Sequence, residues 1–391
     1  MRIAQLANFV GPASGGIKTA INALGAGYAD AGVQRLLLVP GPVDARESTP
    51  HGDVVQFRAP RVGGGYRLIV EPWRVVAALE QFDPTSIEVS DKSTLLPVTR
   101  WARRNDVGSV LFSHERLDLM LGMRTGFEET AKVASAIHNR FLVRQFDAVV
   151  VTSRFAQREF GAAAASAGTP LHRIPLGVDL DDFTPAPVGG PVGGPVSCST
   201  LELGRDVHDG VLRLVHVGRL SREKSPHLAV ATAAELHRRG VRLRLDVFGE
   251  GPHLAELRAI AGGAPVVFHG HIAGRRALAE RLAAADISLS VCPGETFGLA
   301  VLEALACGTP VVTADVGGAS ELIDAESGEK GCADPSSLAD AVLRLAARSV
   351  NRRRAAARAR AEQFPWQHAV DRMLDLHGSL DRTRPVEVRA G

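Results

Sequence analysis

Residues 211–251 read VLRLVHVGRLSREKSPHLAVATAAELHRRGVRLRLDVFGEG, and they repeat a pattern found at the start of the chain. An apolar run typical of a buried strand leads into a glycine turn, a helical pattern and a second apolar run. The same order occurs in residues 2–7, the turn VGPASGGIKT, the helical pattern 17–31 and the run QRLLLVPG at 34–41. Strands that alternate with helices indicate a parallel sheet with helices on both faces. The two openings predict an α/β protein with two Rossmann-like domains that face each other across a cleft.

The segment between the two patterns is rich in proline, glycine and valine. It reads PAPVGGPVGGPVSCSTLELGRDVHDG, residues 185–210, and has neither a helical nor a strand period. This composition is typical of a linker. A glycine-rich ligand loop is the alternative, but such a loop normally joins a strand to a helix. We therefore expect a first domain at 1–184, a linker at 185–210 and a second domain at 211–363.

The composition argues against several classes of protein. The chain has 45 Lys+Arg against 43 Asp+Glu and only 5% aromatic residues, which disfavours a nucleic-acid partner. Its four cysteines lack paired or metal-like spacing, as expected in a reducing compartment. The amino terminus does not look like a signal peptide, and no run reaches the roughly 18 apolar residues of a membrane span. A cytoplasmic protein is the expectation.

Two glutamates stand at either end of the apolar segment PGETFGLAVLEALACGTPVV, residues 293–312. The helical pattern 296–307 would place Glu295 and Glu303 roughly 12 Å apart along one face, too far apart to share a proton or a metal. Two such carboxylates suit the ends of an elongated ligand, with the amides at the amino end of the helix facing a diphosphate. The alternative is a charge at the helix start and a core glutamate paired with arginine.

This segment, followed by ADVGGASELI, resembles the signature of retaining GT-B glycosyltransferases of the group 1 family. The family is glycosyltransferase family 4-like, and includes bacterial phosphatidylinositol mannosyltransferases and sucrose synthases. Its mark is a pair of glutamates, eight positions apart, before a glycine–proline turn and a strand. The resemblance implies that Glu295 binds hydroxyls of the donor sugar and that Glu303 binds the donor ribose.

The resemblance also assigns the residues around the donor diphosphate. The turn VGRLSREKSPHL is similar to the family's GRL…EK turn and implies that Arg219 and Lys224 neutralise the leaving diphosphate. The usual glycine after the lysine is Ser225 here. The predicted donor-binding positions in the second half are Thr296, Phe297, Gly298, Leu299 and, through its backbone beside the base, Ile272. No acid lies between residues 269 and 276 to bind a guanine edge.

The first half of the chain resembles the family more loosely. Gly15 and Gly16 precede a helix and match neither a dinucleotide fingerprint nor a P-loop. The resemblance implies that they let the backbone approach the donor phosphate, whereas a plain strand–helix turn is the alternative. His114 ends a predicted strand, and the family has a histidine in a comparable place, at the donor sugar. The residues after it, Glu115, Arg116 and Asp118, are candidates for contacts with the acceptor.

The implied reaction needs no cofactor and no metal. The family is assigned front-face attack, in which the leaving phosphate takes the acceptor proton, so His114, Arg219, Lys224 and Glu295 serve positioning and charge stabilisation. Asp179, Asp181 and Asp182 have the look of a D-x-D metal site, but we interpret them as turn and surface residues. The substrates are a nucleotide-diphosphate sugar and an unidentified hydroxyl acceptor.

The end of the chain has two further features. Residues 364–380 look like the family's closing helix, which crosses back onto the first domain. The preceding run NRRRAAARARAEQF is strongly basic, and is either a solvated helix face or a contact with anionic lipid, which leaves peripheral membrane association open.

Two other functions compete with glycosyl transfer, namely binding of a nucleotide sugar without transfer and sugar-nucleotide epimerisation. The complete set of Arg219, Lys224, Glu295 and Glu303 disfavours a pure binder, because a binder does not stabilise a leaving group. The hydrolytic acids of an epimerase have no evident position in the sequence. Among donors, GDP-mannose, UDP-glucose and UDP-N-acetylglucosamine are the candidates.

Overall fold

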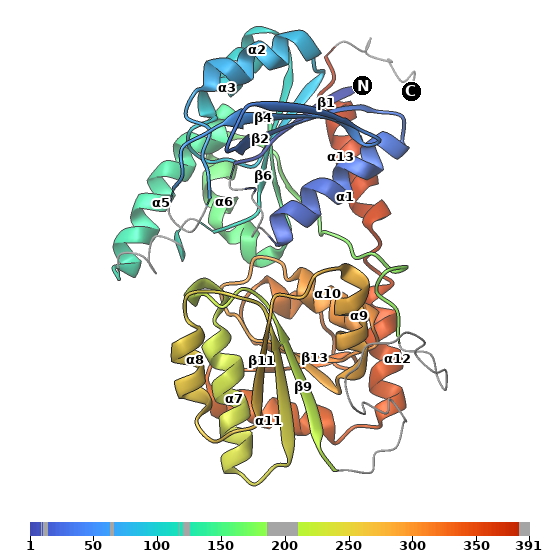
Figure 1. Cartoon of the computed structure of the whole chain (residues 1–391). Coiled ribbons are helices and arrows are strands. Elements are labelled where there is room, and N and C mark those ends of the chain that lie inside the picture. The colour runs from blue at the N-terminus through green and yellow to red at the C-terminus, as the bar shows by residue number, and fades with distance from the viewer. Residues whose placement is uncertain are drawn as a thin grey trace, which may run out of the picture. The chain divides into compact units, whose positions relative to one another are not determined.

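The structure is a computed structural model of the whole chain. It describes residues 1–8, 10, 15–62, 66–116, 118–119, 126–185 and 210–382. The chain divides into two compact units, one made of Met1–Gly177 with Trp366–Gly391 and the other of Val178–Pro365 (Figure 1). Residues 178–184, expected in the first domain, therefore belong to the second unit. Most of the expected linker, residues 186–209, lies outside the described residues.

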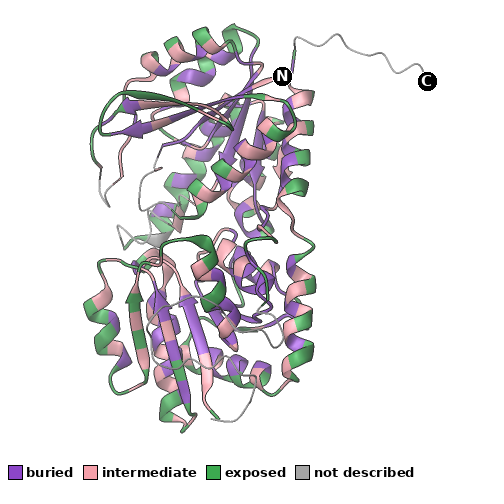
Figure 2. Ribbon diagram, turned by 45° about the vertical axis from the view of Figure 1, so that its right-hand side comes forward, coloured by how far each residue is buried: buried purple, intermediate pink, exposed green. Residues whose placement is uncertain are grey.

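The first unit is built on an eight-stranded sheet with the order β3-β4-β2-β1-β5-β6-β7-β8. Every pairing is parallel except that of β3 with β4. The strands are β1 (Arg2–Leu6), β2 (Gln34–Gly41), β3 (Ala45–Thr49), β4 (Gly52–Arg58), β5 (Ser86–Val89), β6 (Gly108–Ser113), β7 (Ala148–Val151) and β8 (Leu171–Arg173). The central strands are buried on both faces, which explains the apolar run of β7 and of the middle of β6 (Figure 2).

Helices from both ends of the chain cover this sheet. They are α1 (Gly16–Asp30), α2 (Pro72–Phe82), α3 (Leu96–Arg104), α5 (Glu128–Leu142), the 3-10 turn η2 (Val143–Gln145), α6 (Arg154–Ala167) and α13 (Trp366–Ser379). Figure 1 shows α13 alongside α1, and the two helices are in contact. The helix expected at 364–380 is therefore present as α13 and packs within the first unit.

A buried polar network joins α13 to the core of the first unit. His377 is fully buried, with Nδ1 2.8 Å from Ser86 Oγ and Nε2 3.5 Å from the Glu88 carboxylate. The same carboxylate accepts hydrogen bonds from Tyr28 Oη at 2.9 Å and Gln5 Nε2 at 3.1 Å. Burial raises the pKa of Glu88, but His377, Tyr28 and Gln5 outweigh it and hold the pKa below its ordinary value. The last helix thus completes the environment of a carboxylate that lies next to β1.

The second unit contains a six-stranded, all-parallel sheet with the order β11-β10-β9-β12-β13-β14. Its strands are β9 (Leu212–Val217), β10 (Leu243–Phe248), β11 (Val266–Gly270), β12 (Ile287–Ser290), β13 (Val311–Ala314) and β14 (Gly328–Gly331). On one face lie α7 (Pro226–Arg238), α8 (Leu254–Ala261) and α11 (Pro335–Ala346); on the other lie α9 (Arg275–Ala284), α10 (Leu299–Ala306) and α12 (Val350–Ala361) (Figure 1).

The basic run near the end of the chain forms α12, and most of its arginines bind carbonyl groups of the same unit. Arg353 is buried and donates to the carbonyls of Leu345 and Ala346. Arg354, Arg358 and Arg360 likewise donate to main-chain carbonyls of neighbouring loops and helix ends. This helix is therefore neither a fully solvated face nor a lipid-binding face, because most of its arginines donate hydrogen bonds to carbonyl groups of the same unit.

The two places where the chain passes between the units lie side by side. Val178 N–H donates to the Phe364 carbonyl at 2.9 Å, and Val178 forms an isolated parallel bridge with Pro365. Residues 178–185 are held on the second unit, where Phe183 is fully buried beneath the Arg275 guanidinium at 5.4 Å. This packing is the physical reason that the unit boundary falls before residue 184.

Candidate active site

Three of the predicted site residues, Arg219, Lys224 and Glu295, lie at one point of the second sheet. The strand order reverses between β9 and β12, and ligands of open α/β sheets bind beyond the carboxyl ends of the strands at such a switch point. Arg219 lies two residues after β9, and the 3-10 turn η3 (Arg222–Lys224) follows it. Glu295 lies five residues after β12. Two motifs separated by about seventy residues in the sequence thus meet at the same sheet edge.

Lys224 and Glu295 form an ion pair, with Nζ 2.8 Å from Oε2. The Glu295 side chain is 19% exposed, and burial raises its pKa. Lys224 and the N–H groups of Phe297 and Thr296 outweigh this effect and keep the pKa below its ordinary value. Glu295 is therefore an ionised acceptor at neutral pH. The sequence interpretation had placed the Phe297 N–H toward a diphosphate, whereas without ligand it binds the neighbouring carboxylate.

Arg219 adds a second cation to this edge. Its guanidinium lies 3.3 Å from the Glu223 carboxylate. Burial raises the pKa of Glu223, but Ser221, the Glu223 backbone amide, Arg219 and Lys224 together hold this pKa below its ordinary value. Both cations therefore act on one acidic group in a short turn. Ser225 ends this turn in the left-handed region, with φ 48° and ψ 42°, where the family usually has glycine. The serine keeps the turn at a backbone cost of about 1 kcal/mol.

Glu303 occupies a different environment from Glu295. The helix around it is shorter than predicted: α10 begins at Leu299 after Gly298, whose φ is 105°, so Thr296 and Phe297 precede the helix. Glu295 and Glu303 therefore do not share one helix face. Burial raises the pKa of Glu303 to about 7, although Arg275 acts to lower it. A carboxyl with this pKa is partly protonated at neutral pH.

Short backbone contacts connect the loops after β9, β10 and β11. Gly249 has φ 141°, and a Cβ atom there would lie 1.9 Å from the Gly218 carbonyl oxygen, so only glycine fits. Gly249 N–H donates to the Gly270 carbonyl at 2.8 Å. Ile272, predicted to lie beside the base, follows the end of β11 and is half-buried. The N–H of its neighbour His271 donates to the Glu250 carboxylate at 3.4 Å.

The first sheet has its own switch point, between β1 and β5. Gly15 caps α1 and Gly16 is its first residue, and both are exposed. His114 directly follows β6, and its ring packs on Phe112 with centroids 4.3 Å apart. Burial lowers the pKa of His114 to about 4, with Lys92 acting in the same direction and Glu88 against it. The imidazole is therefore neutral at pH 7, which suits hydrogen bonding to a sugar rather than proton donation.

The residues proposed to meet the acceptor are largely engaged within the first unit. Arg116 binds the Asp118 carboxylate at 2.5 Å and stacks on Phe155 at 4.5 Å. The Glu115 carbonyl accepts a hydrogen bond from Lys92, a residue that the sequence interpretation did not single out. Lys92 also follows a strand at the switch point, and its position after VSD was the available signal.

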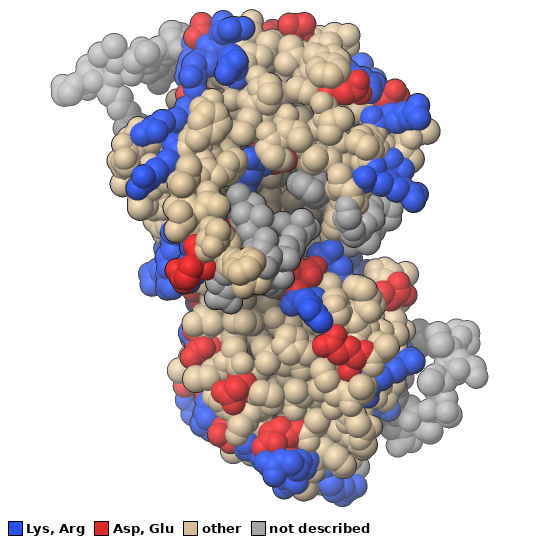
Figure 3. Space-filling model, turned by 90° about the vertical axis from the view of Figure 1, so that its left-hand side faces the viewer, with Lys and Arg blue, Asp and Glu red and all other residues tan. Residues whose placement is uncertain are grey.

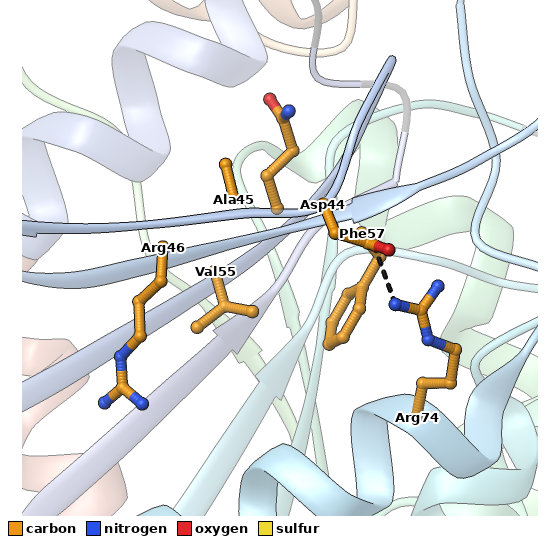
Figure 4. Close-up of a pocket in the computed structure, with 7 residues that line it drawn as sticks. Asp44, Ala45, Arg46, Val55, Phe57 and Arg74 are labelled. Carbon is orange, nitrogen blue, oxygen red and sulfur yellow. Dashed lines mark hydrogen bonds and ion pairs between the residues drawn. The ribbon is translucent and has the colours of Figure 1, made fainter.

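A separate hollow of about 320 Å³ lies near the edge of the first sheet, beside β3, β4 and α2 (Figure 4). Arg74 from α2 crosses it, paired with Asp44 at 2.7 Å and stacked on Phe57 at 5.1 Å. This arrangement ties the β3–β4 hairpin to α2. The hollow contains none of the predicted site residues.

Within the described parts of the chain, no three or more His, Cys, Asp or Glu side chains are grouped as metal ligands. Asp179 Oδ1 instead accepts the N–H groups of Asp181 and Asp182, which is the geometry of a turn. Cys292, Cys307 and Cys332 are free thiols, and Cys198 lies outside the described residues.

Both halves of the chain match known protein families. Residues 15–177 match the glycosyl transferase 4-like domain, and residues 212–348 match the glycosyl transferases group 1. A Mycobacterium tuberculosis protein described as a GDP-mannose-dependent alpha-(1-6)-phosphatidylinositol dimannoside mannosyltransferase is 40% identical over 386 residues, covering 97% of both chains. The chain belongs to the group 1 glycosyltransferases. The resemblance predicted from the glutamate segment is thereby confirmed.

Further comparisons agree on the family and the fold. A D-inositol 3-phosphate glycosyltransferase of Xylanimonas cellulosilytica is 32% identical over 260 residues, covering 63% of this chain and 60% of that one. Sucrose-phosphate synthase from Thermosynechococcus elongatus superposes with a TM-score of 0.74 at 23% identity, covering 98% and 100% of the chains. Anabaena HepE in complex with UDP-glucose superposes with a TM-score of 0.72 at 20% identity, covering 97% of this chain and 100% of that one. This glycosyltransferase has the GT-B fold and uses a nucleotide sugar, so the binder and epimerase alternatives are set aside.

Proposed function

We propose that this glycosyltransferase moves mannose from GDP-mannose to a mannosylated phosphatidylinositol acceptor, with retention of the anomeric configuration. The observation that carries the donor and the acceptor is the 40% identity to the mycobacterial enzyme, which extends over 97% of both chains. The two halves of the chain that would hold donor and acceptor are both included in that similarity. Because the relative's name specifies both substrates, the proposal can be tested one substrate at a time.

The donor site supports transfer by charge stabilisation. Arg219 and Lys224 stand at the sheet edge where the diphosphate would bind, and cations there stabilise the charge that develops as the glycosidic bond breaks. The leaving phosphate takes the acceptor proton, so retention requires no protein nucleophile. Lys224→Ala is expected to lower kcat by about 10²- to 10³-fold, the cost of losing one donor of this kind. A folded variant with near-normal turnover would remove Lys224 from the diphosphate site.

The loop after β10 would supply an acid for a guanine base. No acid lies between residues 269 and 276, but Glu250 from the neighbouring loop accepts the His271 N–H at 3.4 Å. A carboxylate at this place would accept both the N1–H and an amino hydrogen of guanine, whereas uracil has a single ring N–H and no amino group. We expect Glu250→Ala to weaken GDP binding by about tenfold and to leave UDP binding unchanged, as measured by competition. Equal effects on both nucleotides would contradict this assignment.

The acceptor proposal places the substrate in a lipid bilayer, and α5 has a face suited to such a surface. Val133, Ile137 and Phe141 recur every four residues and are 60%, 64% and 54% exposed. Lys132 and Arg140 flank them, while the acids of α5 are confined to its first two residues. Apolar side chains bordered by cations are typical of helices that lie on anionic membranes. The face of the first unit that Figure 3 shows has broad uncharged areas, with Lys and Arg and fewer Asp and Glu mainly toward its margins.

Two experiments test these assignments. Purified protein is incubated with GDP-mannose, UDP-glucose and UDP-N-acetylglucosamine, and GDP or UDP release is measured with and without a phosphatidylinositol mannoside. NMR of the product then gives the anomeric configuration. For the membrane contact, sedimentation with phosphatidylglycerol-containing vesicles should fall at least tenfold in the Val133→Ser/Ile137→Ser/Phe141→Ser variant, and Val316→Ser, on the second unit and 49% exposed, is the control. Among the described residues, no helix has the length and apolar content to cross a bilayer.

A further inference from the structure

Lys92 brings four elements of the first unit together at the switch point of the sheet. It follows β5, and its Nζ donates to the Glu115 carbonyl after β6. The same Nζ lies 3.3 Å from both carboxylate oxygens of Glu159 and 4.9 Å above the ring of Phe160, both on α6. Its own carbonyl is 3.0 Å from His138 Nε2 on α5. One lysine thus connects the loops after two strands to two helices.

The Lys92–Glu159 ion pair is largely buried, and its burial indicates what the pair contributes to the first unit. The two side chains are 14% and 2% exposed. A buried ion pair of this kind contributes little net stability, because desolvation opposes the attraction, and well-packed apolar residues often replace it without loss. Burial lowers the pKa of Lys92, and Glu159 only partly offsets that effect. The pair is therefore better explained by what it holds in place than by the stability it adds.

Lys92 fixes the position of the backbone beside His114. Glu115 immediately follows His114, and its carbonyl also accepts a hydrogen bond from Ser113 Oγ at 3.2 Å. Two donors on one carbonyl fix the direction of the chain as it leaves β6. Asp91, the residue before Lys92, anchors the other side by accepting the N–H groups of Ser93 and Leu95 at 3.0 and 2.8 Å. The positions of the two loop segments are thereby tied to each other.

We propose that Lys92 is a positioning residue of glycosyl transfer, which, with Glu159 as its counter-charge, orients His114 toward the reacting sugar. The inference rests on the proposed role of His114 at the donor sugar. Misplacement of a contacting group by about 1 Å costs on the order of 100-fold in rate, so loss of this support should reduce kcat. Donor affinity should change less than kcat, because the hydrogen bonds of Lys92 described above lie within the first unit and act on the backbone beside His114.

The test separates positioning from folding. Lys92→Met alone leaves the Glu159 carboxylate buried without its cation and should lower the melting temperature. Lys92→Met/Glu159→Gln removes both charges and should recover most of that loss, yet it does not restore the hydrogen bond to the Glu115 carbonyl. We expect the double variant to have kcat reduced 10- to 100-fold and a donor KM within twofold of the wild type. The exposed pair Arg46–Asp53 on β3 and β4, changed to Arg46→Met/Asp53→Asn, is the matched control and should leave kcat unchanged.

NMR titration of His114 supplies a readout that a merely structural role would not move. Lys92 and Glu88 are the charged groups that act on this imidazole, so removal of the lysine should shift its titration upward. A folded double variant with wild-type kcat and an unshifted titration overturns the inference. His114→Ala is assayed alongside. If that variant keeps normal turnover, the proposed role of His114 fails instead, whatever the result for Lys92.

Discussion

The pKa of Glu303 leads to a stability prediction whose size follows from the structure. Burial raises this pKa from 4.5 to about 7. A carboxyl whose folded pKa is raised favours the folded state most fully below its unfolded pKa, and this contribution is lost as pH rises through the folded pKa. With 1.36 kcal/mol per pKa unit, the ionised group destabilises the ligand-free protein by about 3 kcal/mol at pH 8 but by less than about 1 kcal/mol at pH 5.

Glu303→Gln removes the titration while keeping the shape of the side chain. The free energy by which the variant is more stable than the wild type should therefore be larger at pH 8 than at pH 5, by about 2–3 kcal/mol. For a unit of this size that is a difference of roughly 5–10 °C in melting temperature. Differential scanning calorimetry of both proteins at the two pH values measures it. Glu280→Gln, an exposed glutamate on α9, is the control and should show the same melting temperature difference at both.

Donor binding should respond in the opposite sense. If Glu303 accepts the ribose hydroxyls, binding requires the ionised form, so the donor KM of the wild type should rise as pH falls below 7. The Gln variant should bind donor poorly at every pH.

Equal stabilisation of the variant at pH 5 and pH 8 would show that the carboxyl is well solvated, and the reasoning from burial would be wrong.

Three further predictions follow from single residues. The pKa of His114 is about 4 in the folded protein and 6.5 in the unfolded chain. The free energy of unfolding should therefore fall by about 2 kcal/mol between pH 7 and pH 5. Urea unfolding of His114→Asn should lack this pH-dependent fall. Ser225→Gly should raise stability by at most about 1 kcal/mol through relief of the left-handed backbone, and Ser225→Val should lower it. Gly249→Ala should cost more than about 3 kcal/mol or prevent folding, because its Cβ would meet a carbonyl, whereas Gly263→Ala, with open space around it, should be tolerated in the same thermal melt.

The sequence predicted the architecture well because apolar strands and glycine turns are local signals. The runs at 2–7 and 34–41 and the stretch 211–251 correspond to β1, β2, and the β9–α7–β10 segment. The start of α10 was placed three residues too early, since the many Ala and Leu residues of the run 296–307 do not reveal that Gly298 adopts φ 105°. Local composition does not contain that information.

The candidate site was predictable only where residues lie in a motif. Glu295 and Lys224 could each be named from their segments, but their 2.8 Å contact depends on the strand order, which the sequence does not state. Lys92 and Glu159 belong to no motif and are 67 residues apart, so their pairing was not visible. The arginines of α12 were misread for the same reason, because the carbonyl groups that bind them come from distant loops.

The second unit is one uninterrupted segment, Val178–Pro365, whereas the first is assembled from both termini. During translation the amino-terminal sheet emerges first, but it must wait for His377 before Glu88 has its full set of partners. At about 5–20 residues per second, roughly 190 intervening residues impose a delay of about 10–40 s. Throughout that interval the side of α1 that contacts α13 is uncovered on the nascent polypeptide. A premature stop codon just before the last helix would therefore yield a complete second unit attached to a permanently unfinished first unit, a natural substrate for chaperones and proteases.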